Sequence, residues 1–228
     1  MIAAIAFVLL SGWPQTVAKN TQPLISATDP EYLGCTTWTG KEWTKPSARS
    51  ARTPLIQSAK GFRAYAEVKV TVNDGVCTNT TTLYVASGDG GEFKIAYAKL
   101  PSESDGNGIR VIGWSPSGDK LLAEVNLWKY ETDLGYGHVA LIYDASKATA
   151  KEIPALNAAL TLHFGPDCEF ELAIRDWKTN EQILVKISRT PESEEYEQHF
   201  CVKEPHTFVY DLQKETVAAS RPGHQKPK

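Results

Sequence analysis

Short apolar runs separated by polar turns dominate the middle of the chain. Between residues 109 and 154, apolar positions cluster at 111–112, 121–125 and 139–143, and a last short run ends at Ile153. Runs of this length, bounded by Gly, Pro, Ser and Asp, are typical of β-strands. We therefore expect four short strands. The first two are joined by a tight turn, because Pro116 presets one corner and Gly118 accepts the positive φ of another.

An earlier stretch repeats this pattern. The matched positions, all offset by 57 residues, are Ser58 with Ser115, Gly61 with Gly118, and the Ala-Glu-Val triplet at 66–68 with that at 123–125. Agreement at this many positions without a gap indicates an internal repeat.

A third copy is more divergent. It runs over 174–187 and has Asn180 where the turn glycine stands, and asparagine tolerates a left-handed turn. Each copy continues with a second apolar segment and a weaker final strand. The second segments are 82–86, 140–144 and 207–211, and the final strands are 93–97, 150–153 and 216–219. We expect Tyr84, Tyr143 and Tyr210 to occupy one equivalent place. The two strands that flank the Ser/Gly turn, the second segment and the final strand together make each copy a four-stranded unit.

Local patterns add detail to these units. Small and apolar residues alternate with polar ones over 63–70, as in a strand with one buried face. Asn73-Asp74-Gly75 is a strong hairpin signal. Only 155–162 shows a helical period, of a turn or two. Length differences among the copies concentrate in their second hairpins, at 73–80, 126–137 and 189–205.

The turn motif also carries a family resemblance. Segment 114–120, Trp-Ser-Pro-Ser-Gly-Asp-Lys, resembles the Trp-Ser-Pro-Asp-Gly-Lys signature of TolB-like β-propeller repeats, with Ser117 at the place of the usual Asp. The resemblance covers 54–219 and implies an all-β fold of three four-stranded antiparallel blades. Closed propellers typically need about four to eight blades. An open arc capped by the N-terminal arm, two chains sharing one ring as a homo-oligomer, and a sandwich-like repacking all stay open.

Composition and charge describe an ordinary globular chain. Of 228 residues, 42% are hydrophobic and 22% charged, and the net charge of -3 argues against a nucleic-acid partner. Residues 1–18 are typical of an export signal, with an apolar core too short for a transmembrane span. We expect a signal peptide over 1–18, a loop-rich arm over 19–53, the repeat domain over 54–219 and a disordered tail over 220–228. This organisation favours a secreted or periplasmic protein.

The cysteines agree with export. There are four, Cys35, Cys77, Cys168 and Cys201, and none stands in a Cys-x-x-Cys pair. An even count behind an export signal favours two disulfides over a metal site. Three pairings are open; we favour Cys35–Cys77 and Cys168–Cys201, because each joins cysteines within one half of the chain.

No catalytic, cofactor or metal motif is present. Ser115 misses the Gly-x-Ser-x-Gly hydrolase motif by one place and is interpreted as a turn residue. The five histidines lack zinc-ligand spacing. Asn79-Thr80-Thr81 fits an N-glycosylation acceptor in a eukaryotic secretory host.

These observations favour a non-enzymatic exported scaffold. Loops on a rigid framework commonly carry binding, so we expect the variable hairpins to contact a protein or cell-envelope partner. Candidate contact residues lie near the Gly40 turn and in the acidic 189–205 hairpin. They are Trp38, Trp43, Glu194, Glu195, Tyr196 and His199. A glycosidase-like hydrolase with acidic side chains in a blade-rim pocket, and an inhibitor of a secreted enzyme, stay open.

Overall fold

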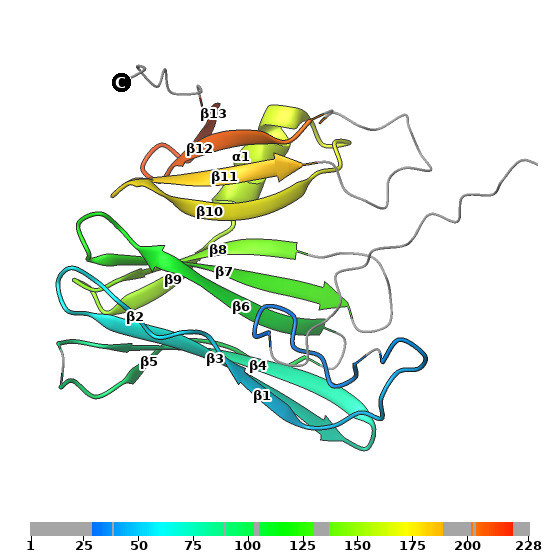
Figure 1. Ribbon diagram of the computed structural model, residues 1–228. Coiled ribbons are helices and arrows are strands. Elements are labelled where there is room, and N and C mark those ends of the chain that lie inside the picture. Colours follow the sequence, from blue (N-terminus) through cyan, green and yellow to red (C-terminus); the bar gives the residue numbers. More distant parts are fainter. Residues whose placement is uncertain are drawn as a thin grey trace, which may run out of the picture.

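Three antiparallel β-sheets stacked in chain order form the body of the protein (Figure 1). The computed structural model describes residues 29–37, 39–88, 90–102, 105–129, 137–188, 202 and 204–220. The all-β fold with three four-stranded antiparallel units is thereby confirmed, and the sheets do not close into a ring.

The first sheet begins with a strand in two pieces. Both β1 (Arg49–Arg52) and β2 (Ile56–Gln57) pair with β3 (Arg63–Asn73). The sheet continues through β4 (Val76–Ala86) to β5 (Lys94–Lys99). The strand alternation expected over 63–70 is confirmed. Its buried members on β3 are Ala64, Ala66, Val68 and Val70, all at most 1% exposed.

The other two sheets have the same simple up-and-down order. The second contains β6 (Asp105–Trp114), β7 (Lys120–Lys129), β8 (Gly137–Asp144) and β9 (Thr149–Ile153). The third contains β10 (Glu171–Thr179), β11 (Gln182–Ser188), β12 (His206–Asp211) and β13 (Thr216–Ala219).

One helix, α1 (Ala155–Phe164), connects the second sheet to the third. It is slightly longer than the turn or two expected there. Its buried Leu156 and Leu160 join the core that the two sheets share. Within the described residues, no helix is long and apolar enough to cross a membrane.

The strand register confirms the repeat and corrects the tyrosine alignment. The equivalent cross-strand pairs are Ala64 with Val85, Leu121 with Tyr143, and Ile183 with Tyr210. Tyr84 therefore lies one residue away from the position of Tyr143 and Tyr210. A shift of one residue turns a strand side chain to the opposite face. Tyr84 accordingly stacks on Tyr65, with ring centroids 5.0 Å apart, on the outer face of the first sheet.

The tight turns also repeat, in part at positions without glycine. Asp144 and Asp211 start equivalent turns, and each carboxylate accepts a backbone N–H two residues later, at 3.0 and 3.1 Å. Ala148 and Glu215 end these turns with φ of 50° and 54°. Asn180, in contrast, is not among the described residues with positive φ, so its expected left-handed conformation is wrong. Asn180 and Glu181 form a two-residue connection between paired Thr179 and Gln182, shorter than the other copies' turns.

The core lies on both faces of the second sheet. On β7, Leu121, Ala123 and Val125 belong to the cluster shared with the first sheet, whereas Leu122 belongs to the cluster shared with the third. The central strand of the stack is thus covered on both sides. Successive side chains of β7 point to opposite faces of the sheet, so they enter two different hydrophobic clusters, and neither face of the strand is turned to solvent.

Candidate functional site

The two ends of the stacked sheets differ in construction. The turns at 58–61, 115–118 and 180–181 lie at one end, on the left of Figure 1, which we call the turn rim. The hairpin at 73–76, the end of β7, the start of β8, the end of β11 and the start of β12 lie at the other, which we call the hairpin rim.

Ion pairs and hydrogen bonds connect neighbouring sheets along the turn rim. Lys60 Nζ lies 3.1 Å from the Asp119 carboxylate, and Lys120 pairs with Glu181. The backbone N–H of Ser117 donates to Asn180 Oδ1 at 2.8 Å. Hydrogen bonds from Ser117 and Lys60 lower the pKa of Asp119 to about 2. Ion pairs and hydrogen bonds therefore join all three sheets along the turn rim.

A pocket of about 370 Å³ opens at the hairpin rim. Its lining comes from the end of β5, the start of β6, the end of β7 and the start of β8. The lining residues are Lys99, Leu100, Ser102, Asp105, Gly106, Asn107, Leu127, Trp128, Lys129 and Gly137. Leu100 is 78% exposed at its mouth, and the Lys129 ammonium pairs with the Asp105 carboxylate. A hydrophobic side chain and fixed charges thus share one opening.

Buried asparagines hold the N-terminal arm against this rim. Asn79 Nδ2 donates to the backbone carbonyls of Leu33, at 2.6 Å, and of Asn107, at 3.2 Å. Asn107 Nδ2 donates in return to the carbonyl of Asn79 at 2.9 Å. Asn79 has no exposed surface, so the acceptor motif at 79–81 cannot be glycosylated in the folded chain. The Asn79 amide instead joins the arm to the first two sheets, and we call Asn79 and Asn107 the asparagine clamp.

A buried charge cluster lies next to this clamp. The Glu124 side chain is only 1% exposed and accepts a hydrogen bond from Arg110 Nε at 3.1 Å. His138 Nδ1 lies 3.2 Å from the other carboxylate oxygen. The same Arg110 guanidinium lies 3.5 Å from Glu31 of the arm and donates to the backbone carbonyl of Ile174 at 2.7 Å. Five segments of the chain, the arm and strands β6, β7, β8 and β10, therefore meet at one arginine and one carboxylate.

The two carboxylates of this cluster respond oppositely to their surroundings. Burial alone would raise the pKa of Glu124, but the neighbouring His138 ring and the Arg110 guanidinium outweigh it and leave that pKa below its usual value. Burial raises the pKa of Glu31, and the attraction of Arg110 offsets this only in part. Glu124 is closed off from solvent, so in this structure it joins parts of the chain and does not face a substrate.

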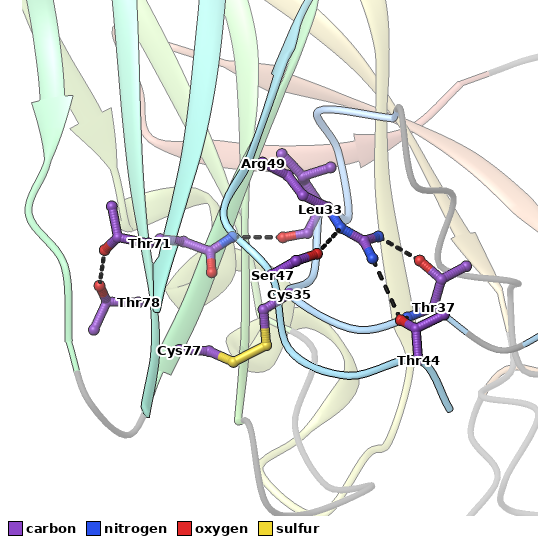
Figure 2. Close-up of a disulfide and its surroundings, with 10 residues drawn as sticks. Leu33, Cys35, Thr37, Thr44, Ser47, Arg49, Thr71, Cys77 and Thr78 are labelled. Carbon is purple, nitrogen blue, oxygen red and sulfur yellow. Dashed lines mark hydrogen bonds between the residues drawn. A yellow bond between two sulfur atoms is a disulfide. The ribbon is translucent and has the colours of Figure 1, made fainter. Parts of the chain in front are cut away.

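The structure tests only some of the residues selected from the sequence. The Cys35–Cys77 disulfide is confirmed and links the arm to β4 (Figure 2). Trp43 is 54% exposed in the same arm, and its role in binding stays a prediction. The partner assumed for Cys168, Cys201, lies outside the described residues, and that pairing stays a prediction. The remaining contact candidates, Trp38, Glu194, Glu195, Tyr196 and His199, also lie outside them.

Ser115 and the side chains that could bind a metal ion have the following surroundings. Ser115 is 4% exposed, and its hydroxyl accepts the Lys120 N–H at 3.2 Å and lies 3.3 Å from Asp119, as expected of a turn residue. Over the part of the chain that the structure describes, no three His, Cys, Asp or Glu side chains are grouped to hold a metal ion.

Sequence reasoning missed the asparagine clamp and the Glu124 cluster. Glu124 and Asn126 alternate with the apolar residues of the strand, a pattern that normally indicates a solvent-facing side. Here the third sheet and the arm cover that side. Comparison of the chain with models of known protein families and with curated proteins finds no match.

Proposed function

We propose that the chain is an exported, non-enzymatic β-repeat scaffold that binds a protein or cell-envelope partner through the hairpin rim. The observation that carries this proposal is the contrast between the two rims. Bonds between adjacent sheets occupy the turn rim, whereas the hairpin rim has a pocket with the exposed Leu100 at its mouth and the exposed Val76 in its hairpin, and the Cys35–Cys77 bond joins it to the arm that carries the exposed Trp43. Exposed apolar side chains also occur at Leu55, Ile95 and Leu162, so the pocket is what distinguishes this rim. Exposed apolar surface with a polar border is typical of interaction sites.

Export and repeat type belong to the same proposal. A disulfide between Cys35 and Cys77 supports an oxidising compartment, since thiols stay reduced in most cytosolic proteins. Three antiparallel four-stranded units support the interpretation of the repeats as degenerate TolB-like blades. In such an assembly the strands supply rigidity and the loops supply contacts.

The test compares matched changes at the two rims. Envelope extract is passed over immobilised full-length protein, over a Trp43→Ser/Leu100→Ser variant, and over a Lys60→Gln variant as the turn-rim control. We expect the wild type and the control to retain the same partner at equal yield. The hairpin-rim variant should retain it poorly, because its two exposed anchors are gone.

Circular dichroism before capture verifies that all three proteins are folded. Equal capture by the wild type and the hairpin-rim variant, or selective loss of capture by Lys60→Gln, contradicts binding through the hairpin rim. Saturable binding of the purified partner, measured by titration, separates specific capture from adhesion to the matrix.

A further inference from the structure

The arm crosses the edge of β6 as a bound peptide would. The N–H of Ile109 on this edge strand donates to the backbone carbonyl of Pro30 at 3.0 Å. The next carbonyls, of Glu31 and Leu33, accept side-chain bonds from Asn126 at 3.5 Å and from Asn79 at 2.6 Å. The arm is a turn at this point, since the Tyr32 N–H donates to the Asp29 carbonyl at 3.3 Å. The edge of β6 and the two asparagines therefore bind three carbonyls of a turn and of the residue that follows it.

Side chains add selectivity to this main-chain recognition. Glu31 pairs with Arg110, and Leu33 is fully buried between the first two sheets. Tyr32 stands between these two residues in the sequence, and its ring centroid lies 6.1 Å from that of Trp128. The groove is thus matched to a turn that presents an acidic, an aromatic and a leucine residue in succession.

Close packing fixes the path of the peptide. A Cβ atom on Gly108 would lie 2.2 Å from the carbonyl oxygen of Glu31 and 2.7 Å from that of Pro30. The peptide therefore passes directly over a position without a side chain. The amide oxygens of Asn107 and Asn126 are buried without a hydrogen-bond partner in the described part of the chain, so the arm is held here through its carbonyls and supplies no N–H to these two oxygens.

The arm forms one unit with the strand that follows it. Ser47 donates its N–H to the carbonyl of Cys35 at 2.9 Å, and Arg49 on β1 donates to Ser47 and to Thr37, as Figure 2 shows. The first strand of the sheet is interrupted at 53–55, between β1 and β2. Thr53 still bonds Ala66 of β3 through its N–H, at 2.9 Å, and its hydroxyl, at 2.8 Å. Exchange of the arm with β1 therefore requires the chain to leave β3 as far as residue 53 and to bend at 54–55, and exchange of an identical element is a low-cost route to dimers.

We propose that the groove is an exchangeable peptide-binding site whose second occupant is the arm of another copy of this chain. The other copy supplies Glu31, Leu33 and Cys35, which complete the same contacts around Arg110, Asn79 and Cys77. The Cys35–Cys77 bond then decides whether a chain's own arm or the exchanged arm is retained. Exchange of an identical element between copies requires no new interface.

Two full-length variants isolate the exchanged state. A Cys35→Ser chain keeps Cys77 in its groove, and a Cys77→Ser chain keeps Cys35 on its arm, so only exchange between them can restore the bond. The two chains carry different affinity tags and are mixed at high concentration under mild oxidation. We expect a covalent heterodimer whose Cys35–Cys77 link is identified by mass spectrometry, and neither variant alone should form that link.

A second change in the arm donor tests recognition without altering the groove. Adding Glu31→Lys to the Cys77→Ser chain should lower the heterodimer yield by about tenfold, because two cations would then face each other. Adding Thr78→Ala to the Cys35→Ser chain, a change at an exposed hydroxyl pair, should leave the yield unchanged. Absence of the link, or a yield insensitive to Glu31→Lys, overturns the proposal.

The wild-type chain provides an independent measurement if either variant fails to fold. Unlabelled and 15N-labelled chains are unfolded, reduced, mixed and refolded together at high concentration. Exchange gives a Cys35–Cys77 peptide pair with one light and one heavy member, in a dimer that gel filtration separates from the monomer. Refolding that yields only light–light and heavy–heavy pairs overturns the proposal.

Discussion

Glu124 on β7 accepts a hydrogen bond from the backbone N–H of Ile174 on β10, with the oxygen and nitrogen 3.2 Å apart. A buried carboxylate of the second sheet thus binds the main chain of the third. Because the other carboxylate oxygen contacts Arg110, which also pairs with Glu31, one side chain connects the arm, the middle sheet and the last sheet. Losing this carboxylate affects every one of those junctions.

Glu124→Ala is accordingly expected to destabilise the fold strongly. The change leaves Glu31 as the remaining carboxylate beside the partly exposed Arg110 and removes the acceptor of the buried Ile174 N–H, which together cost about 2–3 kcal/mol. The free energy of unfolding from urea titration measures this loss. Lys147→Ala is the control, since Lys147 is 73% exposed and its pair with Asp144 is worth about 0–1 kcal/mol. Similar losses in the two variants would contradict a dominant role for Glu124.

The same carboxylate predicts acid sensitivity. Its pKa is lower in the folded chain than the usual value of 4.5, so the folded state binds fewer protons than the unfolded state. Its stabilisation is present above the unfolded pKa and is lost as the pH falls through the lowered folded pKa. Urea titrations from pH 6 downward should show stability declining below about pH 4.5 in the wild type. Glu124→Gln should flatten that decline, and an unchanged pH profile would contradict the prediction.

Glu31 acts in the opposite sense within the same profile. Burial raises its pKa in the folded chain, so its ionised form is disfavoured there and folding becomes easier as this group takes up a proton. Glu31→Gln should therefore steepen the net loss of stability on acidification. The two variants, titrated in parallel, separate the carboxylate that holds the sheets from the one that holds the arm.

Strand patterns and turn residues were sufficient for the architecture. Alternation around Ala64 and the Asn73-Asp74-Gly75 hairpin depend on nearest neighbours, and both are confirmed by the register. The expected position of Tyr84 was wrong because two strands rich in apolar residues can be aligned in registers that differ by one residue. Only the cross-strand partner, Tyr65, decides between them.

Interior polar groups could not be predicted because they depend on contacts between distant segments. Asn79 meets the carbonyl of Leu33 across 46 positions of sequence, and Glu124 meets Ile174 across 50. Neither residue differs in its local pattern from a surface residue on an amphipathic strand. The Cys35–Cys77 bond was predictable because cysteine chemistry limits the choices to three pairings.

Removing the disulfide should loosen the arm. Cys35 and Cys77 are 42 positions apart, and closing a loop of this length stabilises a fold by roughly 4 kcal/mol on the chain-entropy model. Cys77→Ser should lower the urea midpoint accordingly and increase proteolysis within 39–48. The wild type with reductant should behave likewise. Unchanged proteolysis of the arm in both cases would show that the asparagine clamp alone retains it.

The turn rim offers a matched pair of changes at equivalent turns. Gly118 has φ of 74°, and a Cβ there would lie 3.3 Å from the Lys60 N, so Gly118→Ala should cost about 1–2 kcal/mol. Asn180→Gly would be stabilising if Asn180 adopted a left-handed conformation. Because it does not, and because its Oδ1 accepts the Ser117 N–H, the change should instead destabilise by about 1 kcal/mol. Urea titration of both variants decides the matter. A gain in stability for Asn180→Gly would indicate that residue 180 adopts a left-handed conformation after all. It would also show that the Ser117–Asn180 hydrogen bond does not stabilise the contact between the second and third sheets.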